Sequence, residues 1–324
     1  MKPWLAEQQM LLSRQIIDNR FPHAMLFSGG IGSGKLDLAE WLIKVLLCDK
    51  PTKKTETHIL HSCEQCKACR LYQSQTYPDH ISVSSQAKSI GVDDIRLVSR
   101  FLEKTAHIGT YKSVLIPMAE KMTVAASNAL LKTLEEPTDN SVIVLLSCDA
   151  DNLLPTIISR SRLFNLRPPI GNELLDGLVL NAGINSQSVI DEKFINLTNL
   201  PELTDENTLN QFTDFQDKLF VYLAYHQEQA ILLKTLVDEP FAIRWLETIT
   251  VNLMRANYNW LSATELKADL RQRLEQNLKP DTLWSIYQII VNSNKQMKSY
   301  SQVNSQFVME KLLIDIGELA ISAN

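Results

Sequence analysis

The stretch HAMLFSGGIGSGKL, residues 23–36, decides the fold of the first half of this chain. It combines a short apolar strand, a glycine-rich loop and the start of a helix. Gly29, four further residues, Gly34 and Lys35 have the spacing of a phosphate-binding loop. In such a loop, backbone N–H groups and a helix N-terminus face phosphate oxygens, and the lysine reaches the terminal phosphates. We therefore expect Gly29, Gly32, Gly34 and Lys35 to be the nucleotide-binding residues.

The residues around this loop depart from those of a working ATPase. The position after the lysine is normally Ser or Thr, whose hydroxyl binds magnesium, and here it is Leu36. The strand expected at 112–116 would end in Asp-Glu in an ATPase, but Pro117 and Met118 follow it. Glu120 comes two residues later and is a candidate for a displaced carboxylate. The sequence thus predicts a phosphate loop that does not hydrolyse ATP. It leaves open whether ATP or ADP binds there.

Composition and charge limit the classes of protein that this sequence can encode. The 324 residues suffice for two or three domains, and 45% hydrophobic with 21% charged residues is an ordinary composition. A net charge of −5 favours protein partners over a direct grip on DNA, because DNA-binding chains are usually basic. No apolar run approaches the length of a membrane helix, and the N-terminus lacks a signal-peptide core. We expect a cytoplasmic protein without a membrane partner.

Four of the five cysteines are candidate zinc ligands: Cys48, Cys63, Cys66 and Cys69. The last three have CxxCxxC spacing, which favours a metal site over disulfides in a chain without a signal peptide. Zinc takes four ligands in a tetrahedron, so we expect Cys48 to be the fourth, with His58 and His61 as alternatives. The gap at 49–62 is polar and is expected to be a solvated excursion. The ion would be structural and would hold together an inserted segment at about 48–69.

Strand and helix patterns alternate as far as residue 166. We expect helices at 5–19, 36–48, 91–102 and 124–136, and strands at 25–28, 112–116 and 141–147, with a turn leading into a strand at 77–83. This alternation around a phosphate loop predicts a parallel α/β sheet. Arg167-Pro168-Pro169 marks a boundary.

Beyond that boundary, strand signals disappear and helical patterns run to the end, apart from one turn at Gly183-Ile184. Three apolar stripes at helical spacing indicate buried faces: Phe212, Phe215, Leu219, Phe220 and Leu223; Ala242, Trp245, Leu246, Ile249 and Leu253; Val308, Leu312, Ile316 and Leu319. Packing is the expected role of Trp245, Trp260 and Trp284. No catalytic constellation stands out in this half.

Four motifs occur in a characteristic order: the glycine loop, the cysteine set, ALLKTLEEP at 129–137, and Ser159-Arg160-Ser161. This array resembles the clamp-loader subunits of bacterial DNA polymerase III, which belong to the AAA+ family. The missing magnesium hydroxyl and Asp-Glu pair resemble the delta-prime type rather than the ATPase type, gamma or tau. The tail NSQFVMEKLL at 304–313 is also similar to the delta-prime type.

The resemblance implies a three-part architecture. An AAA+-type P-loop domain with the four-cysteine zinc module would cover 1–166, a small helical lid domain 167–207, and a helical collar for oligomerisation 208–324. The chain would assemble with gamma or tau and with delta in a hetero-pentamer. That assembly, part of the DNA-directed DNA polymerase (a nucleotidyltransferase) holoenzyme, loads a sliding clamp onto primed DNA during replication.

The resemblance also implies a catalytic role for Arg160. In the family, the arginine of a Ser-Arg-Cys motif reaches the ATP that is bound to a neighbouring ATPase subunit. Ser161 replaces the cysteine here, a nearly isosteric change. Taken without the resemblance, Arg160 is expected to be a surface or helix-end salt-bridge residue, because arginines near helix ends are common. Arg162 is the alternative finger.

Two other functions are compatible with parts of the sequence. An ATP-hydrolysing motor of the gamma or tau type would need metal-binding groups that Leu36, Pro117 and Met118 do not supply. A zinc-containing nucleic-acid-binding module would need a basic surface, which the net charge of −5 disfavours. The expected role is therefore a non-hydrolysing stator.

Overall fold

The computed structural model describes residues 2–53, 58–83, 89–179, 196–197, 205–257, 274, 278–299 and 304–322. The chain divides into two compact units. One comprises Met1–Ala182 with Ile195–Thr198, and the other comprises Gly183–Phe194 with Asn199–Asn324. None of the described helices is long and apolar enough to cross a bilayer.

A five-stranded sheet forms the centre of the first unit. Its strands are β1 (Ala24–Ser28), β4 (His80–Ser82), β5 (Lys112–Ile116), β6 (Ser141–Ser147) and β7 (Arg162–Asn165). They lie in the order β4-β5-β6-β1-β7, and every pair is parallel. Phe27 of β1 lies opposite both Leu146 and Phe164. The predicted parallel α/β sheet is therefore confirmed.

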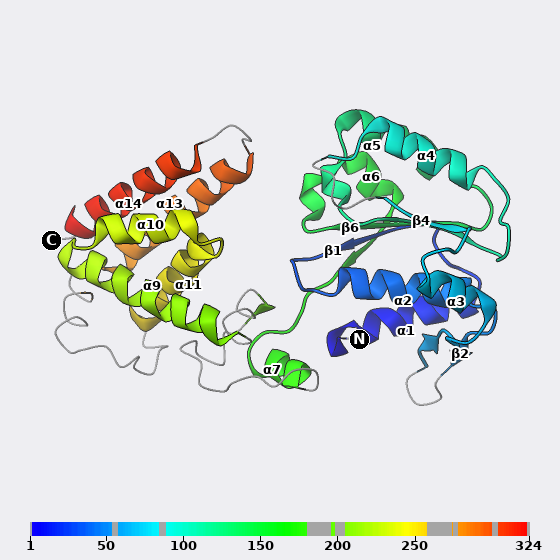
Figure 1. Ribbon diagram of the computed structural model, residues 1–324, viewed down its shortest axis with the longest axis horizontal. Coiled ribbons are helices and arrows are strands. Elements are labelled where there is room, and N and C mark those ends of the chain that lie inside the picture. The colour runs from blue at the N-terminus through cyan, green and yellow to red at the C-terminus, as the bar shows by residue number, and fades with distance from the viewer. Residues whose placement is uncertain are drawn as a thin grey trace. The chain divides into compact units, whose positions relative to one another are not determined.

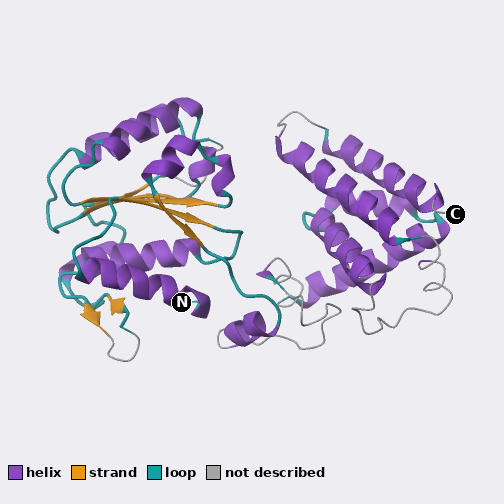
Figure 2. Cartoon of the chain, turned by 180° about the vertical axis from the view of Figure 1, so that it is seen from behind, coloured by secondary structure: helices purple, strands orange, loops and turns teal. Residues whose placement is uncertain are grey.

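Helices cover both faces of this sheet (Figures 1 and 2). One face carries α1 (Ala6–Ile17), α2 (Lys35–Leu47) and α3 (Lys67–Gln73), and the other carries α4 (Val92–Leu102), α5 (Val124–Glu135) and α6 (Pro155–Arg160). Because strand side chains alternate, Met25 and Phe27 pack into the core between the sheet and α1 and α2. Leu26 packs into the core between the sheet and α4, α5 and α6. Three short 3₁₀ turns, η1 (Pro3–Leu5), η2 (Ala119–Lys121) and η3 (Ala150–Asn152), and helix α7 (Asn172–Val179) also belong to this unit.

The gap between Cys48 and Cys63 is only in part the solvated excursion that its polarity predicts. It contains a short antiparallel pair, β2 (Thr52–Lys53) with β3 (Leu60–His61). Ile59 and Leu60 are buried in the core beside α1 and α2. Trp41 Nε1 donates to the Leu60 carbonyl at 2.9 Å, and the Leu60 N–H donates to Ser13 Oγ at 2.9 Å. Two apolar residues in a polar gap therefore anchor the insertion.

The sequence did not predict strand β7 at the sheet edge. Only Phe164 among its four residues is buried, so the strand carries little apolar pattern. The strand forms because its backbone pairs with β1, and its side chains give no sign of this pairing. Beyond β7, the described part of the first unit contains no strand.

The second unit is helical over its described residues: α9 (Glu206–Tyr225), α10 (Gln229–Asp238), α11 (Ala242–Asn257), α13 (Pro280–Ser299) and α14 (Ser305–Ser322). The predicted stripes are largely buried, with Phe212, Phe215 and Trp245 among the largest fully buried side chains. Trp284 is 51% exposed and stacks on Tyr287 with ring centroids 5.8 Å apart, so it packs only in part. Trp260 and the Gly183-Ile184 turn lie outside the described residues. The lid at 167–207 and the collar at 208–324 stay predictions.

Candidate functional site

The phosphate loop lies at the carboxyl end of β1, where α2 begins. Gly29 N–H donates to the Ser147 carbonyl of β6 at 3.2 Å, which fixes the loop's entry. A Cβ on Gly29 would lie 2.5 Å from the Leu166 carbonyl oxygen, so only glycine fits there. Gly34 has a φ of +94° at the N-cap of α2. The tight turn before α2 thus requires these glycines.

Several carbonyl groups of the loop accept hydrogen bonds from side chains of the same chain. Lys35 Nζ donates to the carbonyl of Gly29, and to that of Gly30 at 2.9 Å. From the N-terminal side, Lys2 Nζ donates to the Gly32 carbonyl, and Trp4 Nε1 donates to the Ser33 carbonyl at 2.9 Å. The side chains of Lys35, Lys2 and Trp4 therefore hold the loop through four of its carbonyl groups.

Few side chains near this loop could bind a magnesium ion. Leu36 is 48% exposed and offers no ligand atom. Glu120 lies in η2, and its Oε1 accepts from the Cys148 N–H at 3.2 Å. Burial raises the pKa of the Cys148 thiol, while the charge of Lys35 opposes that effect. Glu120, which follows β5, and Lys35, at the start of α2, therefore both lie close to Cys148, the residue after β6.

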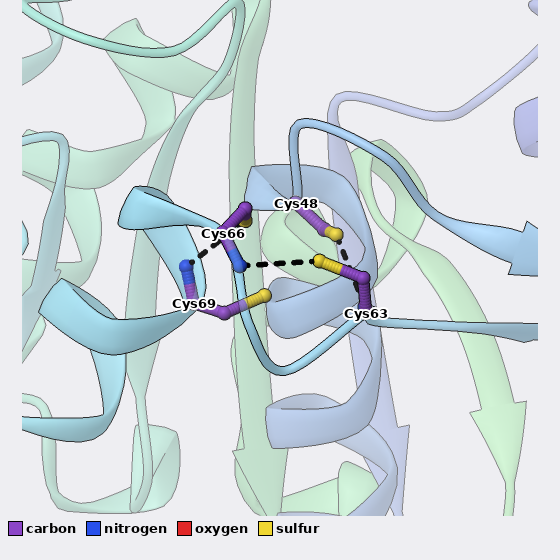
Figure 3. Close-up of side chains that lie close together, drawn as sticks. All are labelled: Cys48, Cys63, Cys66 and Cys69. Carbon is purple, nitrogen blue, oxygen red and sulfur yellow. Dashed lines mark hydrogen bonds between the residues drawn. The ribbon is translucent and has the colours of Figure 1, made fainter.

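The four candidate zinc ligands come together at one place (Figure 3). Their sulfur atoms all lie within 4.8 Å of one another. Tetrahedral zinc with Zn–S bonds of about 2.3 Å would place them roughly 3.8 Å apart, a small contraction. In the described part of the chain, neither His58 nor His61 joins this group. The set Cys48, Cys63, Cys66 and Cys69 fits a metal ion.

Backbone N–H groups stabilise thiolate in this cluster. The Cys63 N–H donates to Cys48 Sγ at 3.2 Å, the Cys66 N–H to Cys63 Sγ at 3.4 Å, and the Cys69 N–H to Cys66 Sγ at 3.4 Å. The N–H groups of Gln65 and Cys66 lower the pKa of Cys63 to about 6. Burial raises the pKa of Cys48 and of Cys69. A cation would supply the charge that keeps these last two ionised.

Arg160 ends α6 with its side chain 37% exposed. Its Nη2 lies 2.6 Å from Glu135 Oε1 at the end of α5. Its Nη1 donates to the Thr156 carbonyl at 3.2 Å and to Ser159 Oγ at 3.4 Å. The guanidinium is thus held at the surface and is accessible to another molecule.

Arg162, the alternative finger, is held differently. With the Gln15 amide turned so that its oxygen faces the guanidinium, that oxygen accepts from Nη1 at 2.9 Å and from Nη2 at 3.1 Å. The guanidinium also lies over the Phe164 ring, 5.6 Å from its centroid. Arg162 therefore joins β7 to α1.

A family model described as "DNA polymerase III, delta subunit" matches residues 5–169, just over half of the chain. This chain belongs to the DNA polymerase III delta subunit family. DNA polymerase III subunit delta' of Pseudomonas aeruginosa is 41% identical over 49% of this chain and 46% of its own length. The Escherichia coli protein of the same name is 28% identical over 97% of this chain and 94% of its own length. Subunit tau of Bacillus subtilis is 31% identical over 48% of this chain and 26% of its own length.

Three residues of the site were not expected from the sequence: Lys2, Trp4 and Glu135. Glu135 lies inside ALLKTLEEP, the most specific motif of the family resemblance, and that motif was the available signal. The N-terminal Lys-Pro-Trp carries no phosphate-loop pattern. Its contacts with Gly32 and Ser33 arise from the packing of η1 beside the loop.

Proposed function

We propose that this chain is a delta-prime-type, non-hydrolysing subunit of a bacterial clamp loader. The observation that carries the proposal is a phosphate loop in which Leu36 stands where a magnesium-binding hydroxyl is expected, with Pro117 and Met118 in place of the Asp-Glu pair. The relatives named delta' that match over 94% of their own length support it, whereas the tau relative matches over only 26%. The chain would act in replication as a structural stator.

In this role Arg160 would complete an ATP site on a neighbouring subunit. A guanidinium placed beside a transferring phosphoryl group stabilises the charge that develops on its oxygens, an effect worth roughly 10³–10⁵ in rate. Arg160 is partly exposed at the end of α6, which is compatible with contact between its guanidinium and a nucleotide on a neighbouring subunit. Gamma or tau and delta would be the partners in a hetero-pentamer, with the helical second unit as the collar. The sliding clamp and primed DNA would be bound through the complex.

The test is the Arg160→Ala variant in the reconstituted loader. We expect assembly to be intact, and the ATPase stimulated by primed DNA and clamp to fall by on the order of 10³-fold at the site that Arg160 completes. Arg96→Ala is the matched control, since Arg96 is an exposed arginine on α4 paired with Asp93 at 2.9 Å. An unchanged rate with Arg160→Ala would remove the finger role.

We further propose that Cys48, Cys63, Cys66 and Cys69 hold structural zinc. Thiolate clusters of this geometry close the coordination sphere, so the ion would supply folding energy and no reaction. Its position beside β3 and α3 would staple the insertion to the end of α2.

A gamma- or tau-type motor is the second candidate. Glu120 favours it, because its carboxylate lies at the strand ends where an ATPase positions its acid. The tau relative matches the first half of the chain in support. The absence of hydroxyl at Leu36 opposes this candidate.

A further inference from the structure

The partner of Arg160 within this chain is Glu135. The two residues end two helices that share one core, in which Leu134 of α5 is 3% exposed and Ile157 of α6 is fully buried. Packing next to both residues therefore fixes the backbone from which each side chain extends. The 2.6 Å contact between Glu135 Oε1 and Arg160 Nη2 joins these two fixed points.

Neither helix electrostatics nor stability accounts for a glutamate at this place. Glu135 lies in the last turn of α5, where the negative end of the helix dipole disfavours a carboxylate. Its side chain is 50% exposed, and ion pairs this exposed contribute little to folding. The effect that remains is geometric: Glu135 limits the directions in which the Arg160 guanidinium points.

We propose that Glu135 is a positioning residue that orients Arg160 toward the ATP of the neighbouring subunit. This inference rests on the proposed finger role of Arg160. Glu135 contacts Nη2, while Thr156 and Ser159 accept from Nη1. The Arg160 guanidinium is therefore ordered before the neighbouring subunit binds. An arginine that is already ordered loses less side-chain freedom when it meets the phosphoryl group. Glu135 acts through Arg160 and need not touch the nucleotide.

The first measurement compares Glu135→Gln with the wild type in the reconstituted loader, with primed DNA and clamp. The glutamine keeps the shape and removes the charge, and we expect kcat for ATP to fall about fivefold with KM unchanged. Glu135→Asp keeps the charge and is expected to retain more activity than Glu135→Gln. Glu136→Gln is the matched control, an exposed neighbouring carboxylate that is expected to keep the wild-type kcat.

A double-mutant cycle separates this inference from the finger role. If Glu135 acts through Arg160, then Glu135→Gln has no further effect in the Arg160→Ala background. A further loss in that background would overturn the positioning role, as would wild-type kcat in Glu135→Gln when Arg160→Ala is slow. If Arg160→Ala itself keeps the wild-type rate, the proposed finger role of Arg160 fails and the positioning role of Glu135 fails with it. Thermal unfolding of each variant checks that the fold is intact.

Discussion

At the scale of single residues, His80 shows how burial controls charge in the first unit. Its Nδ1 lies 2.9 Å from Ser113 Oγ on the neighbouring strand, and its ring lies against Tyr72 with centroids 5.2 Å apart. Burial lowers the pKa of His80 to about 4. The ring is therefore neutral in the folded chain at neutral pH. In the unfolded chain it would gain a proton near pH 6.5.

This difference predicts a pH dependence of stability. Below about pH 6.5 the unfolded chain binds a proton that the folded chain does not take up until about pH 4, so the His80 contribution is present above 6.5 and is lost as pH falls toward 4. After discounting for partial exposure, we expect a loss of about 1–2 kcal/mol in unfolding free energy between pH 7 and pH 4.5.

Urea unfolding of wild type and His80→Gln across this pH range measures the effect. The glutamine cannot titrate, so its stability profile is expected to be flatter than that of the wild type, with every other titrating group common to both. Parallel profiles for the two proteins would show that His80 does not carry the dependence.

At the scale of elements, the cysteine cluster joins pieces that have little core of their own. Strands β2 and β3 have two residues each, and α3 has seven. Segments this short gain little from local structure, because helix nucleation is costly and an isolated hairpin is marginal. Ile59, Leu60 and Ala68 pack against the core that lies beside α1 and α2, and a metal ion held by the four sulfur atoms would supply a second attachment.

We expect one zinc ion per chain, which is lost in Cys66→Ser. Without the metal, amide hydrogen exchange should quicken over residues 58–73, while the central strands β1 and β6 keep their protection. The measurement combines zinc analysis with hydrogen exchange and mass spectrometry.

Cys148→Ser is the matched control, since Cys148 is a free cysteine that lies outside the cluster. It is expected to keep its zinc. Chains that contain no zinc after expression with the metal supplied, or that lose it equally in Cys148→Ser, would contradict the assignment. Loss of zinc in His61→Ala with retention in Cys48→Ser would identify the histidine as the fourth ligand.

At the scale of the whole molecule, one chain joins an α/β unit that carries a phosphate loop to a second unit that is helical over its described residues. Four carbonyls of the loop, those of Gly29, Gly30, Gly32 and Ser33, accept hydrogen bonds from the side chains of Lys35, Lys2 and Trp4. Hydrolysis also needs magnesium ligands, and the chain offers Leu36, Pro117 and Met118 at those positions. The full chain is therefore expected to lack turnover by itself.

We expect no magnesium-dependent ATP turnover by the purified full chain, with or without primed DNA and clamp, and no difference between wild type and Lys35→Ala. A phosphate-release assay measures this directly. Turnover that both Lys35→Ala and Glu120→Gln abolish would establish the motor function instead. In that case Glu120 would act as the displaced carboxylate.

Sequence patterns predicted features that depend on neighbours along the chain. Glycine spacing located the phosphate loop, apolar runs located β1, β5 and β6, and CxxCxxC spacing brought three cysteines onto one turn. The predicted helix at 124–136 ends at Glu135, because Pro137 and its neighbour cannot continue it. Strand β7 was missed because an edge strand with one buried residue has no periodic signal.

The sequence by itself determined the parallel α/β class, the loop and the cysteine set, because each is encoded by spacing within a few residues. Only the tertiary structure decided which distant groups meet. Asp79 accepts from the N–H groups of His107, Ile108 and Gly109 at 2.7, 2.8 and 3.2 Å, and these hydrogen bonds lower its pKa although burial opposes them. The same holds for Arg160 with Glu135 and for Trp4 with Ser33. Such pairs depend on how the sheet and its helices pack, and no local period records them.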